Sequence, residues 1–299
     1  MAFRRSLLAA SLLLAPTAAY AQGEEAAAQS AWDSIIWIDG PGTGTLGKEA
    51  DVAIPATCRF TGAEGARKFM ELTENPTSGN EHGLLLCAGD TEDNSWFVIF
   101  IWDGSGYVTD DDRDQIDANA IIARIREGTE ASNEIRKERG WSTLTVDGWV
   151  VAPHYDTLTK NLTWSIQAHD SEGQGVVNHS VRLLGRGGVM KVDLVLDPAQ
   201  LESTMPVFDA IVAGTTFIPG RTYAEWRDGD KVAGYGLTAL VAGGAGVAAA
   251  KLGLFGKLWK VILGVLVAAK KLVIVVVLAA VALVKRLFGK KETASTAAT

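Results

Sequence analysis

Residues Leu162–Leu196, LTWSIQAHDSEGQGVVNHSVRLLGRGGVMKVDLVL, show the clearest secondary-structure pattern in the chain. They contain three runs rich in β-branched and apolar residues, separated by two short turn sequences, DSEG at 170–173 and GRGG at 185–188. The three runs are Leu162–His169, Val176–Leu184 and Val189–Leu196. Because connections this short join antiparallel neighbours, the stretch predicts two successive β-hairpins and an antiparallel sheet.

The flanking segments extend this sheet and add helices. Further strands are predicted at Asp51–Phe60, where Val52, Ile54, Ala56 and Cys58 alternate onto one face, at Trp96–Trp102 (WFVIFIW) and at Ser142–Pro153. Helices are predicted at Gly62–Asn75, at Asp114–Arg139 and at Pro198–Val212, the last with Asp197 as its cap. Because the helices do not alternate strictly with strands, we expect an α+β fold with a largely antiparallel sheet.

The N-terminus is predicted to be an export signal, since its apolar run is too short for a membrane-spanning anchor. Arg4 and Arg5 precede the apolar run Leu7–Leu14, and Ala19-Tyr20-Ala21 closes a segment typical of a secretory signal peptide over residues 1–21. We expect the mature chain to begin at Gln22. An N-terminal segment, residues 22–40, then leads to a periplasmic α+β domain at residues 41–230.

The C-terminal part is predicted to anchor the chain in the bacterial inner membrane. Residues 231–257 are expected to form a Gly/Ala-rich helix, 258–287 a transmembrane anchor and 288–299 a tail that is first basic and then polar. Lys270 and Lys271 interrupt the apolar part of the anchor and make its insertion marginal. The Gly/Ala-rich helix could instead pair with the anchor as a hairpin, although the positive-inside bias favours a single span.

Charge is strongly segregated along the chain. Residues 22–230 carry sixteen Lys/Arg against thirty-four Asp/Glu, a net charge of −18, whereas residues 231–299 carry ten Lys/Arg against one acid, a net charge of +9. The acidic domain argues against nucleic acid as a partner, since phosphate neutralisation supplies most of such affinity. The C-terminal helix and the basic tail predict membrane lipids as partners, with anionic headgroups beside the tail cations.

Two local features have competing explanations. Cys58 and Cys87 could form a disulfide in an oxidising compartment, or each could be a buried free thiol in an apolar strand, and the sequence does not decide between them. The run Gly42–Lys48 fits a phosphate-loop pattern, but Glu49 stands where a Ser or Thr must hold the metal. A turn between two strands is therefore predicted there.

The candidate site residues form no complete catalytic set. Asp110 and Asp112 belong to an acid cluster that could hold a cation, although the cluster fails the EF-hand spacing and also suits a helix N-terminus. His154 and Asp156 could present an imidazole beside a carboxylate, and Arg182 or Arg186 could join them. No catalytic residue, metal site or cofactor is predicted.

Three stretches carry a resemblance to a known family: SGYVTDDD at 105–112, NHSVRLLGRGGVM at 178–190 and GDKVAGYGLTALVAGGAG at 229–246. Together with Gly140-Trp141 and the PHYD run at 153–156, they resemble a bacterial family of uncharacterised membrane-anchored proteins, defined by a domain of unknown function. The resemblance covers roughly residues 35–290. It implies a signal peptide, an extracytoplasmic domain and a C-terminal anchor, and it brings no assigned activity.

Two functions follow from these features. The first is a non-enzymatic, membrane-anchored envelope protein that works through protein partners or self-association. The second is a membrane-tethered hydrolase, or a domain that binds a small ligand or a cation. Convergence of His154, Asp156 and Asp110 with an arginine in one cleft would favour the second function.

Overall fold

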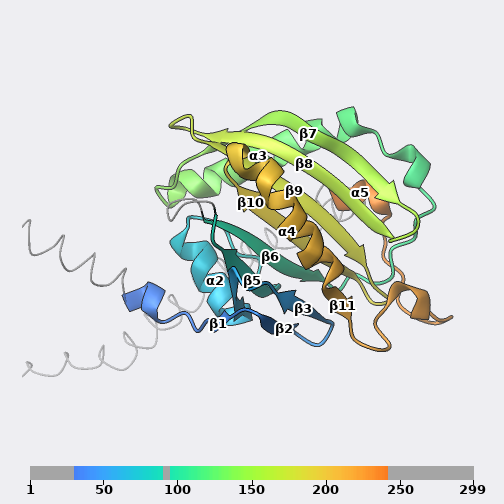
Figure 1. Ribbon diagram of the computed structural model, residues 1–299. Coiled ribbons are helices and arrows are strands. Elements are labelled where there is room, and N and C mark those ends of the chain that lie inside the picture. Colours follow the sequence, from blue (N-terminus) through green and yellow to red (C-terminus); the bar gives the residue numbers. More distant parts are fainter. Residues whose placement is uncertain (1–29, 90–94, 242–299) are drawn as a thin grey trace, which may run out of the picture. The chain divides into compact units, whose positions relative to one another are not determined.

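The computed structural model describes residues 30–89 and 95–241, which form an α+β fold built on a large antiparallel sheet (Figure 1). The predicted signal peptide, anchor and tail lie outside the described residues, as does most of the predicted Gly/Ala-rich helix. Among the residues described, no helix combines the length and the apolar composition that crossing a membrane requires.

The large sheet has eight strands in the order β1-β4-β5-β6-β10-β9-β8-β7, with antiparallel pairing throughout. The strands are β1 (Ile38–Asp39), β4 (Cys58–Gly62), β5 (Glu81–Cys87), β6 (Trp96–Asp103), β7 (Leu144–Asp156), β8 (Asn161–Asp170), β9 (Gly175–Leu184) and β10 (Val189–Leu196). The two predicted hairpins, β8–β9 and β9–β10, are confirmed. The predicted strands at Ser142–Pro153 and Trp96–Trp102 are β7 and β6.

The predicted strand Asp51–Phe60 is two strands that belong to different sheets. Its first half is β3 (Ala50–Ile54), which lies between β2 (Gly42–Leu46) and β11 (Thr215–Phe217) in a three-stranded sheet. Its second half is β4 in the large sheet. A turn at Pro55, closed by a 3.0 Å hydrogen bond from Cys58 N–H to the Pro55 carbonyl, separates the two. The alternation of apolar residues runs through this turn, and the pattern alone therefore predicts one strand.

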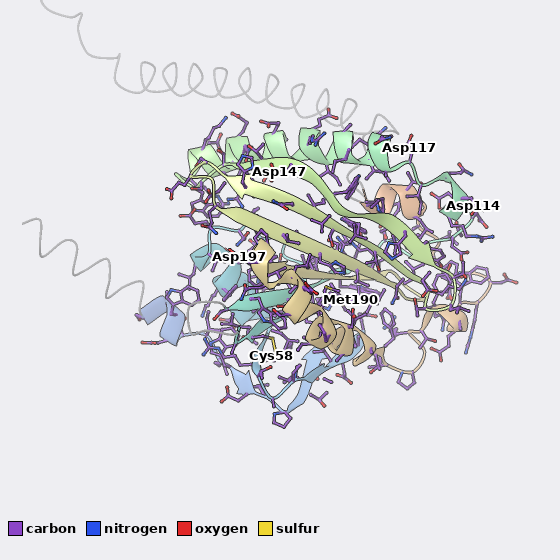
Figure 2. All side chains as sticks on the ribbon, turned by 45° about the horizontal axis from the view of Figure 1, so that its top comes forward. Cys58, Asp114, Asp117, Asp147, Met190 and Asp197 are labelled. Atoms are coloured by element: carbon purple, nitrogen blue, oxygen red, sulfur yellow. A yellow bond between two sulfur atoms is a disulfide. The ribbon has the colours of Figure 1, made fainter. Side chains whose placement is uncertain are left out.

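Two helices cover one face of the large sheet. In α2 (Ala63–Leu72), Ala66 and Phe69 pack against Leu84 of β5 and Ile99 of β6. The second is α3 (Ala118–Glu138), whose Ile121 packs with Trp164 of β8. Figure 2 shows Asp117 at the start of α3, where its carboxylate accepts hydrogen bonds from the N–H groups of Asn119 and Ala120. This cap explains why α3 begins later than the predicted Asp114.

Helix α4 (Leu201–Ala213) and the small sheet cover the opposite face. Phe208 and Ile211 are fully buried against the large sheet, in a core that also contains Leu46 and Val52. The short 3₁₀ turn η2 (Pro198–Gln200) precedes α4, and Asp197 caps it through the N–H of Ala199 as predicted. The large sheet is therefore buried on both faces, a layer of helices lying on one side and a mixed layer on the other.

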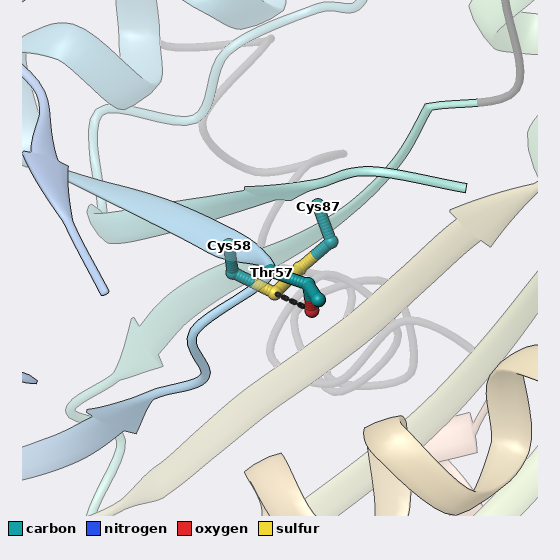
Figure 3. Close-up of a disulfide and its surroundings, with 3 residues drawn as sticks. All are labelled: Thr57, Cys58 and Cys87. Carbon is teal, nitrogen blue, oxygen red and sulfur yellow. Dashed lines mark hydrogen bonds between the residues drawn. A yellow bond between two sulfur atoms is a disulfide. The ribbon is translucent and has the colours of Figure 1, made fainter. Parts of the chain in front are cut away.

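Cys58 and Cys87 form a disulfide between the adjacent strands β4 and β5 (Figure 3). Both residues are buried in the core on the α4 side of the sheet. The structure thereby decides the question that the sequence leaves open. The bond links two strands that are 29 residues apart in the chain.

Candidate functional site

The loop that follows β6 and the segment that leads to α5 (Leu237–Val241) lie side by side at one end of the large sheet. The N–H of Tyr107 donates to the Lys231 carbonyl, and the N–H of Ala233 donates to the Tyr107 carbonyl, both at 2.8 Å. Gly106 has a φ of +117°, and a Cβ there would lie 2.7 Å from the Lys231 carbonyl oxygen. Only glycine permits this approach. We call residues 103–112 and 226–241 together the junction.

Side chains from Asp103, Ser105 and Tyr235 reinforce the junction. The Tyr235 hydroxyl donates to Asp103 at 2.8 Å and lies 2.6 Å from the Ser105 hydroxyl. Burial opposes ionisation of Asp103, but the ammonium of Lys191 and the hydrogen bonds from Tyr235 and Ser105 outweigh it, and the pKa of Asp103 lies below its ordinary value. The same burial, with the Asp103 carboxylate, raises the pKa of Tyr235. This network keeps a carboxylate ionised inside the fold.

Asp112 caps the start of α5. Its two carboxylate oxygens accept from the N–H groups of Leu237 at 2.9 Å and Thr238 at 3.1 Å. Gly236 lies against this carboxylate, because a Cβ at that position would be 2.6 Å from its atoms. Within the segment 231–257 that was predicted to be a Gly/Ala-rich helix, the residues before α5 are not helical, and they pair with the junction loop instead. The remainder of that segment lies outside the described residues.

Arg186, in the turn between β9 and β10, connects the end of the large sheet to the C-terminal segment of the junction. Its guanidinium donates twice to Asp230, at 2.6 and 2.8 Å. These hydrogen bonds lower the pKa of Asp230 to about 2. A bidentate arginine–carboxylate pair fixes orientation as well as charge, so the pair holds residues 226–241 against the end of the sheet.

Asp110 faces the β7–β8 hairpin and not the rest of its acid cluster. It accepts from the Tyr155 hydroxyl and from the Lys160 ammonium, each at 3.0 Å. Burial alone would raise the pKa of Asp110, but these two donors outweigh it and hold the pKa below its ordinary value. Among the described residues, no group of three or more His, Cys, Asp or Glu side chains is arranged to hold a metal ion.

Arg182 lies in the middle of the sheet on the α3 side and is 7% exposed. Its guanidinium donates to Asp193 of β10 at 2.7 Å and stacks on Trp164 of β8, 4.5 Å from the ring centroid. Ser180 also donates to Asp193. Arg182 therefore pairs across three neighbouring strands inside the sheet layer.

His154 and Asp156 lie near the end of the edge strand β7. The His154 ring nitrogen Nδ1 is 3.3 Å from the Ala152 carbonyl, and the side chain is exposed. Asp156 accepts from the N–H groups of Leu158 at 2.7 Å and Thr159 at 3.4 Å, and these bonds, that from Leu158 first, hold its pKa below the ordinary value. Asp156 thus shapes the β7–β8 turn.

A cavity of about 830 Å³ lies beside the junction, between α4, β11 and the start of β8. Its lining includes the aromatic residues Tyr107, Tyr223, Trp226 and Phe217. Tyr107 and Tyr223 are stacked with ring centroids 4.4 Å apart. The cavity has the volume of a small-molecule site. None of the six candidate residues lines it, and no hydrogen bond or ion pair joins any two of the six.

A buried hydroxyl–imidazole pair was not predicted from the sequence. Ser165 of β8 is hydrogen bonded to Nδ1 of His179 on β9, and the His179 ring packs edge-on against Phe208 of α4 at 5.2 Å. Burial lowers the pKa of His179. Ser165 has no exposed surface, so a substrate cannot reach its hydroxyl. The pairing depends on strand register, and no local motif marks it.

Comparison with known proteins identifies a family and no activity. Residues 38–281 match the model of a family described as protein of unknown function (DUF2167). The solution structure of cyanobacterial PsbP (CyanoP) from Synechocystis sp. PCC 6803 is similar over 62% of this chain and 93% of that chain, at 10% identity and a TM-score of 0.35. No curated protein sequence matches. Since the family match spans most of the chain, the protein belongs to the DUF2167 family of proteins of unknown function.

Proposed function

We propose that this chain is a periplasmic domain, tethered to the inner membrane, that acts by binding partners and not by catalysis. The observation that carries the proposal is the use made of the candidate polar residues. Asp112 and Arg186 hold the segment that leads toward the expected anchor, and Asp110 holds the neighbouring hairpin. Residues that could have formed an active site instead hold together the segments of the domain that precede the expected anchor in the sequence.

The disulfide supports the same proposal. Disulfides persist in oxidising compartments and are rare in reducing ones, so the Cys58–Cys87 bond agrees with export to the periplasm. The expected signal peptide and the basic, apolar C-terminal region point the same way.

Membrane fractionation and protease accessibility test the proposal. We expect the full-length chain to stay in the membrane pellet after alkaline carbonate, and external protease to cleave the domain in spheroplasts but not in intact cells. A cytoplasmic reporter at the C-terminus should be active if the anchor is a single span. Recovery of the chain in the cytosol with residues 1–21 still attached would contradict the proposal.

A second candidate function is binding of a small ligand, which the 830 Å³ cavity favours. A hydrolase has less support, because the described lining residues include no His, Cys or Ser. Filling the cavity with Val212→Trp should abolish any thermal stabilisation that a metabolite panel produces in the full-length protein. The control is Val150→Trp, at an exposed position on β7. Equal stabilisation of both variants would place the ligand elsewhere.

A further inference from the structure

A second cavity, of about 430 Å³, lies between helix α3 and the large sheet, and we call it the α3 cavity. The helix runs along β7 on this side of the sheet (Figure 2). Near the start of α3, Ile121 packs against the sheet and is 1% exposed. Further along the helix, Ile125, Thr129 and Arg136 line the cavity instead. The helix and the sheet are therefore closely packed at one end of α3 and leave a space at the other.

Apolar side chains of the sheet form much of the lining of the α3 cavity. They come from four neighbouring strands: Leu144 and Val146 of β7, Ile166 of β8, Val176 of β9 and Val195 of β10. Each is only half-buried, although it lies on the face of the sheet that α3 covers. Because apolar surface gains free energy when it leaves water, this part of the cavity suits the apolar part of a small ligand.

Arg136 of α3 is a buried cation in the same lining. Its side chain is 7% exposed, and its guanidinium donates one hydrogen bond, to the Ser142 carbonyl at 2.9 Å. Within residues 30–89 and 95–241, no carboxylate lies within 4 Å of its nitrogen atoms, and its other side-chain N–H groups have no hydrogen-bond acceptor. Buried arginines are normally paired, and a guanidinium binds a carboxylate through two parallel hydrogen bonds. Arg136 therefore offers an unused site for a carboxylate.

Glu74 contributes a negative charge to the lining of the α3 cavity. Its carboxylate accepts from the Ser142 N–H at 3.3 Å, so the backbone of Ser142 binds Arg136 through its carbonyl and Glu74 through its N–H. Burial lowers the pKa of Arg136, and the Glu74 carboxylate opposes that shift. The two charges thus act on each other without forming an ion pair. Asp170, the other acid in the described lining, accepts from N–H groups of its own turn.

We propose that the α3 cavity binds a small zwitterion with an apolar body, the chemistry of an apolar α-amino acid. The ligand carboxylate lies against Arg136, its ammonium faces Glu74, and its side chain covers the apolar residues of the sheet. An amino acid carries its two charges on neighbouring atoms, and it therefore fits beside a cation and a carboxylate that are bound to one residue but do not pair with each other. This inference does not depend on the proposed tether.

Calorimetric titration of the full-length protein in detergent micelles tests the proposal with probes of similar shape. The probes are L-leucine, 4-methylpentanoate, which lacks the ammonium, and 3-methylbutylamine, which lacks the carboxylate. We expect L-leucine to bind at least about tenfold more tightly than either analogue, because each analogue leaves one charged group of the protein without a partner. Equal binding of L-leucine and 4-methylpentanoate overturns the proposal. So does the absence of binding by L-leucine, L-valine and L-phenylalanine at millimolar concentration.

Substitutions at the cavity decide whether the ligand binds there. Glu74→Gln should weaken the binding of L-leucine to the level of 4-methylpentanoate, and its matched control is Glu71→Gln, at an exposed position of α2 outside the lining. Ala168→Leu fills the cavity and should abolish binding of L-leucine. Its control is Gln167→Leu, at an exposed position on the opposite face of β8, which should leave binding unchanged.

Arg136→Gln should lower the affinity for L-leucine at least about tenfold. Because Arg136 also holds the Ser142 carbonyl, circular dichroism must show that this variant folds. If it does not fold, the two substitutions at Glu74 and Ala168 still decide the question. Unchanged binding of L-leucine by Ala168→Leu, or a Glu74→Gln variant that keeps its preference for L-leucine over 4-methylpentanoate, overturns the proposal. Both results leave the membrane tether to its own test by carbonate extraction.

Discussion

At the scale of single residues, Asp112 and Gly236 show how closely two distant segments fit. The carboxylate of Asp112 occupies the space that a Cβ at 236 would need, and it satisfies two N–H groups at the start of α5. Both residues lie in the stretches on which the family resemblance rests. Their pairing explains why an acid and a glycine stand there, and it assigns Asp112 a structural role.

Replacing Asp112 with alanine should lower the free energy of unfolding by about 1 kcal/mol, the typical cost of losing a helix cap. Urea denaturation followed by circular dichroism would measure the loss. The matched control is Asp111→Ala, at an exposed neighbour, which should change stability by less than about 0.5 kcal/mol. Equal effects of the two substitutions would show that the cap contributes nothing.

The Arg186–Asp230 pair predicts a pH dependence of stability. Because the folded pKa of Asp230 is about 2 and the ordinary value is 3.8, the ionised pair stabilises the fold above about pH 4, and this stabilisation is lost as the pH falls toward 2. The wild-type protein should therefore have a higher urea midpoint than Asp230→Asn at pH 6, and the difference should shrink between pH 4 and pH 2. A difference that is constant over this range would contradict the pairing.

At the scale of elements, the strands and helices whose apolar residues recur at a regular spacing could be predicted. The grouping of the strands into two sheets could not. The hairpins β8–β9 and β9–β10, the buried strand β6 and helix α2 could be recognised from the spacing of apolar residues and from turn residues. The single strand expected at Asp51–Phe60 was wrong, because Pro55 turns the chain without interrupting the alternation. The alternation of apolar residues along a strand indicates which face of the strand is buried, but it does not indicate to which sheet the strand belongs.

The disulfide between β4 and β5 should stabilise the domain against unfolding. Closing a loop between residues 29 positions apart should stabilise the domain by about 3–4 kcal/mol, mainly by restricting the unfolded chain. Reduction should lower the denaturation midpoint of the wild-type protein accordingly. The double variant Cys58→Ala/Cys87→Ala should be insensitive to the reductant. A wild-type midpoint that reductant leaves unchanged, with free thiols confirmed by alkylation, would refute the estimate.

At the scale of the whole molecule, an acidic domain precedes a basic, apolar C-terminal region in the sequence, and residues 226–241 of the junction include the boundary between them. Residues 103–112, the β9–β10 turn and residues 226–241 are far apart in the chain, yet they contact one another at one end of the sheet. The stretches that carry the family resemblance therefore build one structural unit.

The proposed export predicts the first residue of the mature chain. Mass spectrometry of the protein purified from membranes should find Gln22 as the first residue, because the segment that ends in Ala19-Tyr20-Ala21 has the small residues that signal peptidase requires. Replacing Ala19 and Ala21 with bulky residues should block cleavage and retain the precursor. A mature protein that begins at Met1 or Ala2 would show that residues 1–21 are not removed.

The amino-acid sequence is enough to predict the α+β class, the hairpins within Leu162–Leu196 and the separation of charge. These features depend on the spacing of apolar residues, on turn residues and on composition along the chain. Tertiary structure alone decided the disulfide, the division between two sheets and the partners of Asp110, Asp112, Arg182 and Arg186. Each of these depends on which distant segments pack together. The cost of leaving a buried charge or backbone N–H unpaired then selects the partners, and no local pattern records that selection.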